Sequence, residues 1–274
     1  MISLNNLFSL SPGAYIVTGG LGFLGYQHCK AIAAAGGTPV AIDVSFDQEE
    51  SLKNEIKNEY GIDLISINAD ITSKTSLLKA ASEISNNYPI KGLINNAARN
   101  PKVEKSGLIN KSRLEDFSLS EWNQDVNIGL TGSFLCTQVF GSIMNKSSGG
   151  SIVNISSDLG LIAPRQSLYL QEGLKREEQP VKPVTYSVIK SGLIGLTKYT
   201  ATYWPENVRC NCLCPGGIEN NQPPDFISKV SAEIPLGRLA KQDEYIGAVI
   251  YLMSQASSYM TGSIISIDGG RTCW

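Results

Sequence analysis

Short apolar runs rich in β-branched residues alternate with amphipathic helical stretches along the whole chain of 274 residues. This alternation predicts βαβ units, because parallel strands need a long crossover between them and that crossover is usually a helix. We therefore expect an α/β fold with a doubly wound, seven-stranded parallel sheet and helices on both faces. The predicted strands cover residues 14–18, 38–43, 63–68, 91–96, 151–156, 208–214 and 263–268, and the predicted helices cover 22–35, 47–60, 73–87, 119–145, 184–203 and 241–254.

No internal repeat, low-complexity tract or linker rich in proline and glycine divides the sequence. We expect residues 1–274 to form a single domain. Two insertions interrupt the alternation, near residues 99–118 and residues 158–183, and each follows a predicted strand. Doubly wound sheets bind ligands at the carboxyl ends of their strands, so both insertions are candidate substrate loops.

A glycine-rich segment, TGGLGFLG at residues 18–25, joins the first predicted strand to the first predicted helix. Glycines at this place allow a tight turn and let a pyrophosphate rest on the backbone N–H groups at the start of the helix. Asp43 ends the second predicted strand, where its carboxylate would accept hydrogen bonds from the adenosine ribose and repel a 2′-phosphate. The pattern predicts a dinucleotide site that prefers NAD over NADP. An aspartate that merely ends a strand is the alternative interpretation of Asp43.

Acid–base chemistry in this chain needs a group other than histidine. The one histidine, His28, lies in the helix behind the glycine-rich segment. Tyr186 and Lys190 stand one helical turn apart at the start of a predicted helix, which places both on one face. A nearby ammonium stabilises a phenolate and so lowers the pKa of the phenol from ~10 towards a useful range. The pair is a candidate catalytic dyad, and a solvated helix face is the alternative interpretation.

Charge and composition argue against several classes of partner. Lys and Arg number 23 against 25 Asp and Glu, and no basic stripe is present that would follow a nucleic acid or an anionic membrane. No apolar run approaches the ~18 residues that span a bilayer, so we expect a cytoplasmic protein without membrane contact. Cys210, Cys212 and Cys214 do not have the spacing of a zinc site, so we expect small buried side chains and no metal.

Several motifs in order resemble the short-chain dehydrogenase/reductase family. They are the glycine-rich segment, NNA at residues 95–97, Asn127, the serine pair at residues 156–157, the Tyr186–Lys190 pair and PGGI at residues 215–218. The ending IDGG at residues 267–270 resembles the compact, one-domain branch of the family. This resemblance covers almost the whole chain and implies a single Rossmann domain that moves hydride between a nicotinamide cofactor and an alcohol or carbonyl carbon.

The resemblance also implies roles for particular residues. Tyr186 would be the acid and base, and Ser157, the second of the serine pair, would hydrogen-bond the substrate oxygen. Lys190 would hold the nicotinamide ribose and tune the phenol, and Asn127 would anchor a water in the proton relay. The implied cofactor-binding residues are Gly19, Gly22, Phe23, Leu24, Asp43, Asp70, Ile71, Asn96, Ala97, Tyr186, Lys190, Pro215, Gly216 and Ile218.

The sequence departs from the pattern of the compact branch at four places. The glycine spacing is that of the longer branch, which contains sugar-nucleotide epimerases and dehydratases, and Phe23 stands where the compact branch has glycine. Ala98 replaces the glycine of NNAG, and Asn220 stands where a threonine commonly follows the PG turn. The segment from Ser157 to Tyr186 is longer than in most relatives, so we expect it to form a flap over the substrate.

The substrate is the least constrained part of the interpretation. Basic residues in the insertions would suit a phosphate or carboxylate, although a solvated loop is the alternative: Arg165, Lys175, Arg176, Lys182, Arg99, Lys102, Lys105, Lys111 and Arg113. The helix at residues 184–203 and the tail GGRTCW are similar to a subgroup associated with flagellin modification and nonulosonic-acid sugars, which implies a phosphorylated or nucleotide-linked sugar. The resemblance also implies a homodimer or homotetramer. Two rival functions stay open: a sugar-nucleotide epimerase or dehydratase with recycled NAD, and a non-catalytic NAD-binding sensor.

Overall fold

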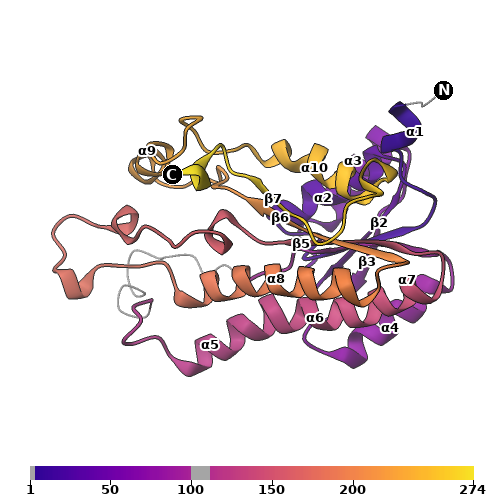
Figure 1. Ribbon diagram of the computed structural model, residues 1–274, viewed down its shortest axis with the longest axis horizontal. Coiled ribbons are helices and arrows are strands. Elements are labelled where there is room, and N and C mark those ends of the chain that lie inside the picture. The colour runs from indigo at the N-terminus through magenta and orange to yellow at the C-terminus, as the bar shows by residue number, and fades with distance from the viewer. Residues whose placement is uncertain (1–3, 100–111) are drawn as a thin grey trace.

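The computed structural model describes residues 4–99 and 112–274, and its centre is a twisted parallel sheet (Figure 1). Seven strands lie in the order β3-β2-β1-β4-β5-β6-β7, and every neighbouring pair is parallel. This order reverses direction between β1 and β4, and such a switch point is where doubly wound sheets bind ligands. The strands are Ala14–Thr18, Thr38–Asp43, Ile65–Asn68, Ile90–Asn95, Gly150–Ile155, Val208–Pro215 and Ile264–Ile267 for β1 to β7.

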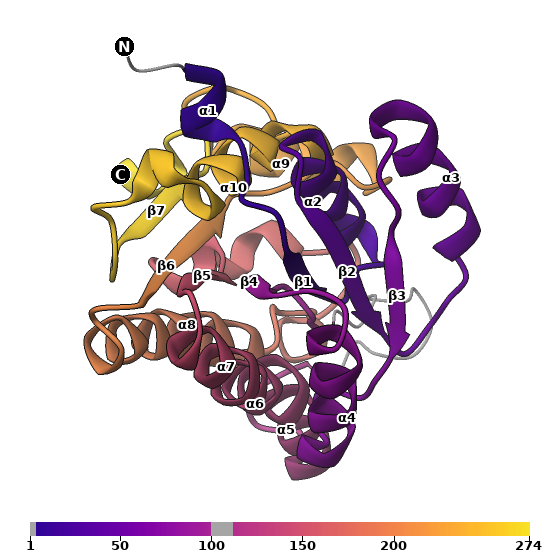
Figure 2. The ribbon, with the colours of Figure 1, turned by 90° about the vertical axis from the view of Figure 1, so that its right-hand side faces the viewer.

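Helices cover both faces of the sheet, as Figure 2 shows in a view turned by a quarter. On one face lie α2 (Phe23–Ala34), α3 (Glu49–Tyr60) and α10 (Ile246–Met253). On the other face lie α4 (Lys74–Ser85), α8 (Val184–Tyr203) and one long helix formed by α5 (Leu119–Val126), α6 (Gly132–Cys136) and α7 (Ser142–Lys146). Each face has its own apolar core, because alternate strand residues point to opposite sides of the sheet.

The predicted α/β class, strand number and parallel topology are confirmed, and the differences concern short elements. The sequence prediction did not include α1 (Leu4–Phe8) or α9 (Pro224–Ser231), which are too short to show a helical period. The helix predicted at residues 241–254 is divided into a 3₁₀ turn, Gln242–Tyr245, followed by α10. Cys210, Cys212 and Cys214 are buried in β6 as predicted.

The long helix at Leu119–Lys146 is apolar enough in length and composition to cross a membrane, with a mean hydropathy of 1.2. In this fold it packs against the sheet, and Phe140 and Met144 lie fully buried in the core. A buried core helix of a globular domain accounts for that composition. Two π-helical turns, Asn127–Thr131 and Thr137–Gly141, interrupt it, and such turns often occur at functional sites.

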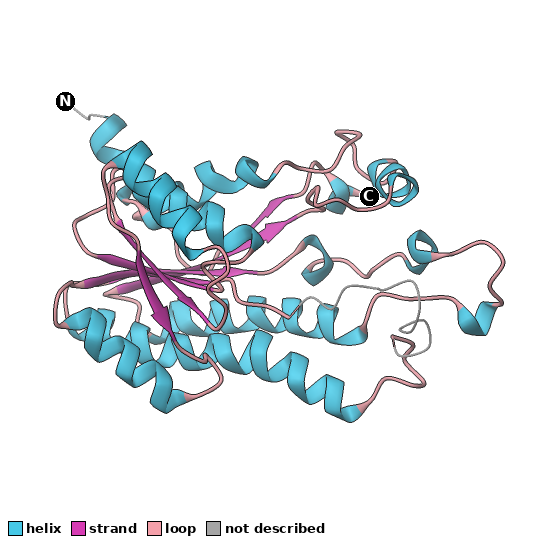
Figure 3. Ribbon diagram, turned by 180° about the vertical axis from the view of Figure 1, so that it is seen from behind, coloured by secondary structure: helices cyan, strands magenta, loops and turns pink. Residues whose placement is uncertain are grey.

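The second insertion extends from the carboxyl edge of the sheet as a chain of 3₁₀ turns (Figure 3). Leu168 from this insertion packs into a small apolar cluster with Val230, Ile234 and Leu239, so the insertion lies against α9 and the segment that follows it. Most of the first insertion, residues 100–111, lies outside the described residues. Its last part contacts the second insertion, because the Val181 N–H donates to Ser112 Oγ at 3.3 Å.

Candidate active site

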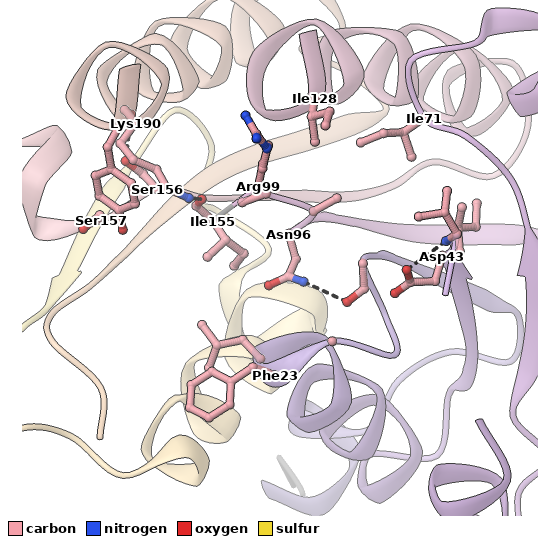
Figure 4. Close-up of a pocket in the computed structure, with 18 of the residues that line it drawn as sticks. Phe23, Asp43, Ile71, Asn96, Arg99, Ile128, Ile155, Ser156, Ser157 and Lys190 are labelled. Carbon is pink, nitrogen blue, oxygen red and sulfur yellow. Dashed lines mark hydrogen bonds between the residues drawn. The ribbon is translucent and has the colours of Figure 1, made fainter. Parts of the chain in front are cut away.

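A cavity of about 780 Å³ opens at the carboxyl ends of the strands, at the switch point of the sheet (Figure 4). Asp43 and Ile71 lie at one end of the view, and Ser157 and Lys190 lie at the other, with Asn96 between them. The structure thus brings together in one cavity all the site residues expected from the sequence: Gly19, Gly22, Phe23, Leu24, Asp43, Asp70, Ile71, Asn96, Ala97, Asn127, Ser157, Tyr186, Lys190, Pro215, Gly216 and Ile218.

The glycine-rich turn is fixed by backbone conformation and close contacts. Gly19 has φ 61°, in the left-handed region that favours glycine. A Cβ on Gly25 would stand 1.9 Å from the carbonyl oxygen of Gly19, so only glycine lets the first turn of α2 approach the loop. The start of α2 thereby presents free backbone N–H groups to the cavity, as a pyrophosphate requires.

Two polar side chains join this turn to the end of β4. Thr18 Oγ1 accepts hydrogen bonds from the backbone N–H groups of Asn96 at 3.0 Å and Ala97 at 3.1 Å. The Asn96 side-chain amide donates to the carbonyl oxygens of Thr18 at 3.0 Å and Gly19 at 3.2 Å, and Figure 4 shows the bond to Gly19. Asn96 therefore holds the turn in place in addition to lining the cavity, a contribution that the sequence motif did not reveal.

Asp43 stands at the carboxyl end of β2 with both oxygens facing backbone donors. Its carboxylate accepts from the N–H groups of Leu21 at 3.1 Å and Val44 at 2.8 Å. These bonds orient the carboxylate at the adenosine end of the cavity. Oδ1 also accepts from the Ser45 N–H at 3.3 Å, whereas Oδ2 has Leu21 as its one described donor and keeps capacity to accept from a ribose hydroxyl. Among the described lining residues the basic ones are Arg99 and Lys190, and Arg99 is paired with Glu121 and Asp125. The residues present thus fit the adenosine end of a nicotinamide dinucleotide.

At the opposite end, α8 brings Tyr186 and Lys190 to the end of β5. The Lys190 ammonium donates to the carbonyl oxygen of Ile155 at 2.8 Å, which fixes its position beneath the phenol. Burial lowers the pKa of Lys190 to about 8. Burial also raises the pKa of Tyr186, while a hydrogen bond with Ser157 opposes that rise. In this environment the charges around the ring decide whether Tyr186 keeps or releases its proton.

A second lysine, Lys182 from the insertion, lies over the same ring. Its ammonium is 3.8 Å from the ring centroid of Tyr186, compared with 5.7 Å for Lys190. Burial lowers the pKa of Lys182 to about 8, and no described acidic side chain lies within ion-pair distance of it. Lys182 is therefore a partly desolvated cation beside the candidate catalytic phenol.

The two serines have different environments. The Ser156 hydroxyl donates to the carbonyl oxygen of Lys190 at 2.7 Å, so it holds β5 and α8 together. The Ser157 hydroxyl donates to the Asp158 carboxylate at 2.7 Å and faces the cavity beside Tyr186. Asn127 lines the cavity where the long helix changes to a π-helical turn.

The other described basic residues of the insertions have acidic partners or are exposed to solvent. Arg165 pairs with Glu233, and Arg113 pairs with Glu115 at 2.9 Å. Lys175 and Arg176 are exposed. Lys102, Lys105 and Lys111 lie outside the described residues. Among the described residues the alternative of a solvated loop therefore fits Arg165, Lys175 and Arg176, whereas Arg99, Arg113 and Lys182 are partly buried.

Two ionic networks near the site, one partly buried and one buried, were not anticipated from the sequence. Arg99 contacts Asp125 at 3.1 Å, and Asp125 accepts from the Thr185 hydroxyl at 2.6 Å, which fixes the start of α8 against the long helix. Asp158, next to Ser157, pairs with Arg271 at 2.7 Å. No motif marks these pairs, because their members are far apart in the sequence.

Comparisons with known proteins agree with this arrangement. Residues 14–169 match the family model for short chain dehydrogenase, and residues 174–272 match the model described as enoyl-(acyl carrier protein) reductase. The chain is 32% identical over 261 residues to the 3-oxoacyl-[acyl-carrier-protein] reductase of Aquifex aeolicus, covering 93% of this chain and 95% of that protein. It is 30% identical to the post-translational flagellin modification protein A of Campylobacter coli, covering 93% and 96%. Other relatives are a galactitol 2-dehydrogenase and an NADP-dependent mannitol dehydrogenase, from Rhizobium johnstonii and Alternaria alternata.

The fold comparison gives the same family. A short-chain type dehydrogenase/reductase from Mycobacterium marinum superposes with a TM-score of 0.84 at 28% identity, and the match covers 100% of both chains. Matching family models cover most of the sequence, and the seven-stranded sheet has the topology expected from the motifs. The chain therefore belongs to the short-chain dehydrogenase/reductase family of oxidoreductases.

Proposed function

We propose that this protein is an NAD(H)-dependent dehydrogenase that interconverts a secondary alcohol and a ketone. The observation that carries the proposal is the shared cavity, with Tyr186 and Lys190 at one end and Asp43 with the glycine-rich turn at the other. A cavity of this size and polarity suits an extended dinucleotide with a small substrate beside Tyr186.

Each residue at the catalytic end has a distinct task in the proposed reaction. In the oxidation direction, the Tyr186 phenolate accepts the proton of the substrate hydroxyl, and Ser157 donates a hydrogen bond to that oxygen. The bound nicotinamide would supply the hydride acceptor. Lys190 favours the phenolate through its positive charge, and Asn127 anchors a water that carries the proton onward. In the reduction direction the Tyr186 phenol returns the proton to the carbonyl oxygen.

Asp43 favours NAD over NADP in this proposal. A ribose with free hydroxyls can donate to the Asp43 carboxylate, whereas a 2′-phosphate placed there would bring two negative charges together. Relatives that use NADP belong to the same family, so family membership does not decide the cofactor, and the proposed preference rests on Asp43.

Replacing Asp43 with alanine is expected to narrow the difference in affinity between NAD and NADP. Loss of a charge-assisted hydrogen bond should raise the Kd for NAD by about 10-fold or more, and loss of repulsion should lower the Kd for NADP. Calorimetric titration of both cofactors measures the effect. Asp47→Ala, which removes a nearby carboxylate that does not line the cavity, should leave both values unchanged. Equal affinities in the parent protein would contradict the role given to Asp43.

The proposed substrate is a sugar or a related polyol derivative that carries a phosphate or another anionic group. Lys182 supports the proposal of an anionic group, because a partly buried cation without a described acidic partner would gain from a bound anion. Lys182 lines a second pocket rather than the cavity itself, and its ammonium lies 3.8 Å from the centroid of the Tyr186 ring, so an anion bound to it would lie beside the candidate catalytic phenol. Phosphorylated and nucleotide-linked sugars both meet this description, and membership of the flagellin-modification subgroup is part of the same proposal.

Replacing Lys182 with methionine is expected to raise KM for an anionic substrate by about 10-fold to 100-fold, as loss of a charge-assisted contact predicts. Methionine is unbranched like lysine and nearly as long, and it carries no charge. Steady-state kinetics on a sugar phosphate and on the same sugar without phosphate distinguish loss of anion binding from a general loss of substrate binding. KM for the neutral sugar should change by less than about 2-fold, and Lys182→Arg should retain most of the affinity for the phosphate. An equal rise for both substrates would exclude anion recognition.

The direct test of the proposed function is an assay of the purified protein with NAD and a panel of sugar phosphates, nucleotide sugars and simple secondary alcohols. Formation of NADH that depends on Tyr186 supports the dehydrogenase and names the substrate class. Product formation without net NADH would instead favour an epimerase or dehydratase. Tight binding of NAD without turnover of any compound would favour a sensor.

Three further properties belong to the same proposal. The chain works as a single domain over residues 1–274, with the two insertions as its substrate loops. It forms a homodimer or homotetramer, as sedimentation or light scattering would measure. It acts in the cytoplasm on small molecules and binds neither nucleic acid nor membrane.

A further inference from the structure

A buried ion pair joins the candidate catalytic serine to the C-terminal tail. Asp158 follows Ser157 in the 3₁₀ turn Asp158–Gly160, and Arg271 belongs to the turn Arg271–Cys273 at the end of the chain. The Arg271 guanidinium lies 2.7 Å from Asp158 Oδ2, and the two side chains are only 9% and 4% exposed. A buried ion pair gains little net stability once the desolvation of both charges is counted. Stability alone therefore does not explain this pair.

Asp158 controls where the Ser157 proton points. The carboxylate paired with Arg271 has only acceptor oxygens, so the hydroxyl of Ser157 is the donor in their 2.7 Å contact. The backbone N–H of Leu159 donates to the same carboxylate oxygen at 2.8 Å. When Ser157 turns its proton to a substrate oxygen, Asp158 loses one hydrogen bond and keeps those from Leu159 and Arg271. Those two donors make the release of Ser157 less costly.

The pair also sets the charge beside Tyr186. The groups near this phenol come from several elements: Lys190 on α8, Lys182 before it, Asp158 beside Ser157 and Tyr169 on the second insertion. Arg271 on the tail acts on this group through its contact with Asp158. Burial is the main cause that raises the pKa of Tyr186, and the negative charge of Asp158 adds to it. Arg271 balances that charge at 2.7 Å.

We propose that Asp158 and Arg271 are positioning residues of the active site, through which the C-terminal tail orients Ser157 and balances the charge next to Tyr186. This inference rests on the proposed function, in which Ser157 and Tyr186 handle the substrate proton. Neither Asp158 nor Arg271 touches the reacting atoms in it, and no covalent bond of either residue changes. Loss of one partner leaves the other charge uncompensated beside the phenol.

The test compares two single variants, each of which removes one charge of the pair, with a double variant that removes both. Arg271→Gln leaves Asp158 unbalanced and should move the Tyr186 titration to higher pH by about one unit, whereas Asp158→Asn leaves Arg271 unbalanced and should move it lower by a similar amount. The double variant D158N/R271Q removes both charges and should return the titration to within a few tenths of a unit of the parent. Arg271→Lys keeps the charge and should shift it least.

Two readouts follow the same phenol. One is the pH profile of kcat, and the other is the ultraviolet absorbance of the phenolate in the protein without substrate, corrected with the Tyr186→Phe variant. The second readout needs no turnover, so it tests the ion pair even when no compound in the panel reacts. If Arg271→Gln does not fold, Asp158→Asn and the double variant still test the proposal. Shifts of the same sign in both single variants, or folded variants that titrate like the parent, would overturn it.

Discussion

Replacement of Tyr186 with phenylalanine is expected to lower kcat by about 1,000-fold while the affinity for NAD changes by less than about 3-fold. The phenol is the group beside Ser157 that can exchange a proton with a substrate oxygen, and a positioned acid–base group contributes roughly 10²–10⁴-fold to the rate. Phenylalanine keeps the ring that lies under Lys182, so the shape of the cavity is retained. NADH absorbance gives kcat, and calorimetric titration gives the Kd for NAD.

Tyr199→Phe is the matched control for this prediction, because it makes the same change on an exposed residue of the same helix. It should leave kcat and the Kd for NAD as in the parent. A Tyr186→Phe variant that kept full turnover would contradict the proposed mechanism for any substrate. A drop in activity accompanied by an equal loss of NAD affinity would instead indicate a binding role for the phenol.

The parts of the fold and of the site that could be predicted depend on residues that lie close together in the sequence. Strand and helix periods predicted the order of the core elements along the chain. That order was sufficient to predict the parallel sheet, because parallel strands with helical crossovers permit few topologies. The glycine-rich turn, Asp43 and the Tyr186–Lys190 pair could be found because each depends on a short spacing beside a recognisable strand or helix. The structure places all of them around one cavity.

The features that the sequence did not reveal depend on tertiary distance. Asp158 and Arg271 are 113 positions apart, and neither residue type is unusual where it stands. The same holds for Arg99, which looked like a free cation in an insertion but pairs with Asp125 on the long helix. In the sequence Lys182 is one of several basic residues in the insertions. It is distinguished from them only in the fold, by its burial and by its place over the Tyr186 ring.

A second large effect is expected from replacing Gly25 with alanine. The added Cβ would stand 1.9 Å from the oxygen of Gly19 and 2.8 Å from the Cα of Gly20, and both are backbone atoms that cannot rotate away. The glycine-rich turn must therefore move away from the start of α2. We expect the Kd for NAD to rise on the order of 100-fold, about 3 kcal/mol, and the free energy of unfolding to fall by about 1–3 kcal/mol.

Gly195→Ala on α8 separates this effect from that of adding a methyl group to any helix. A Cβ there meets no atom within 4 Å, so alanine should leave the Kd for NAD unchanged and raise the free energy of unfolding by up to about 1 kcal/mol. Calorimetric titration and denaturant unfolding of both variants give the two quantities. Parent-like NAD binding by Gly25→Ala would mean that the turn does not hold the pyrophosphate, because the backbone geometry that forms the cradle could not survive the added Cβ.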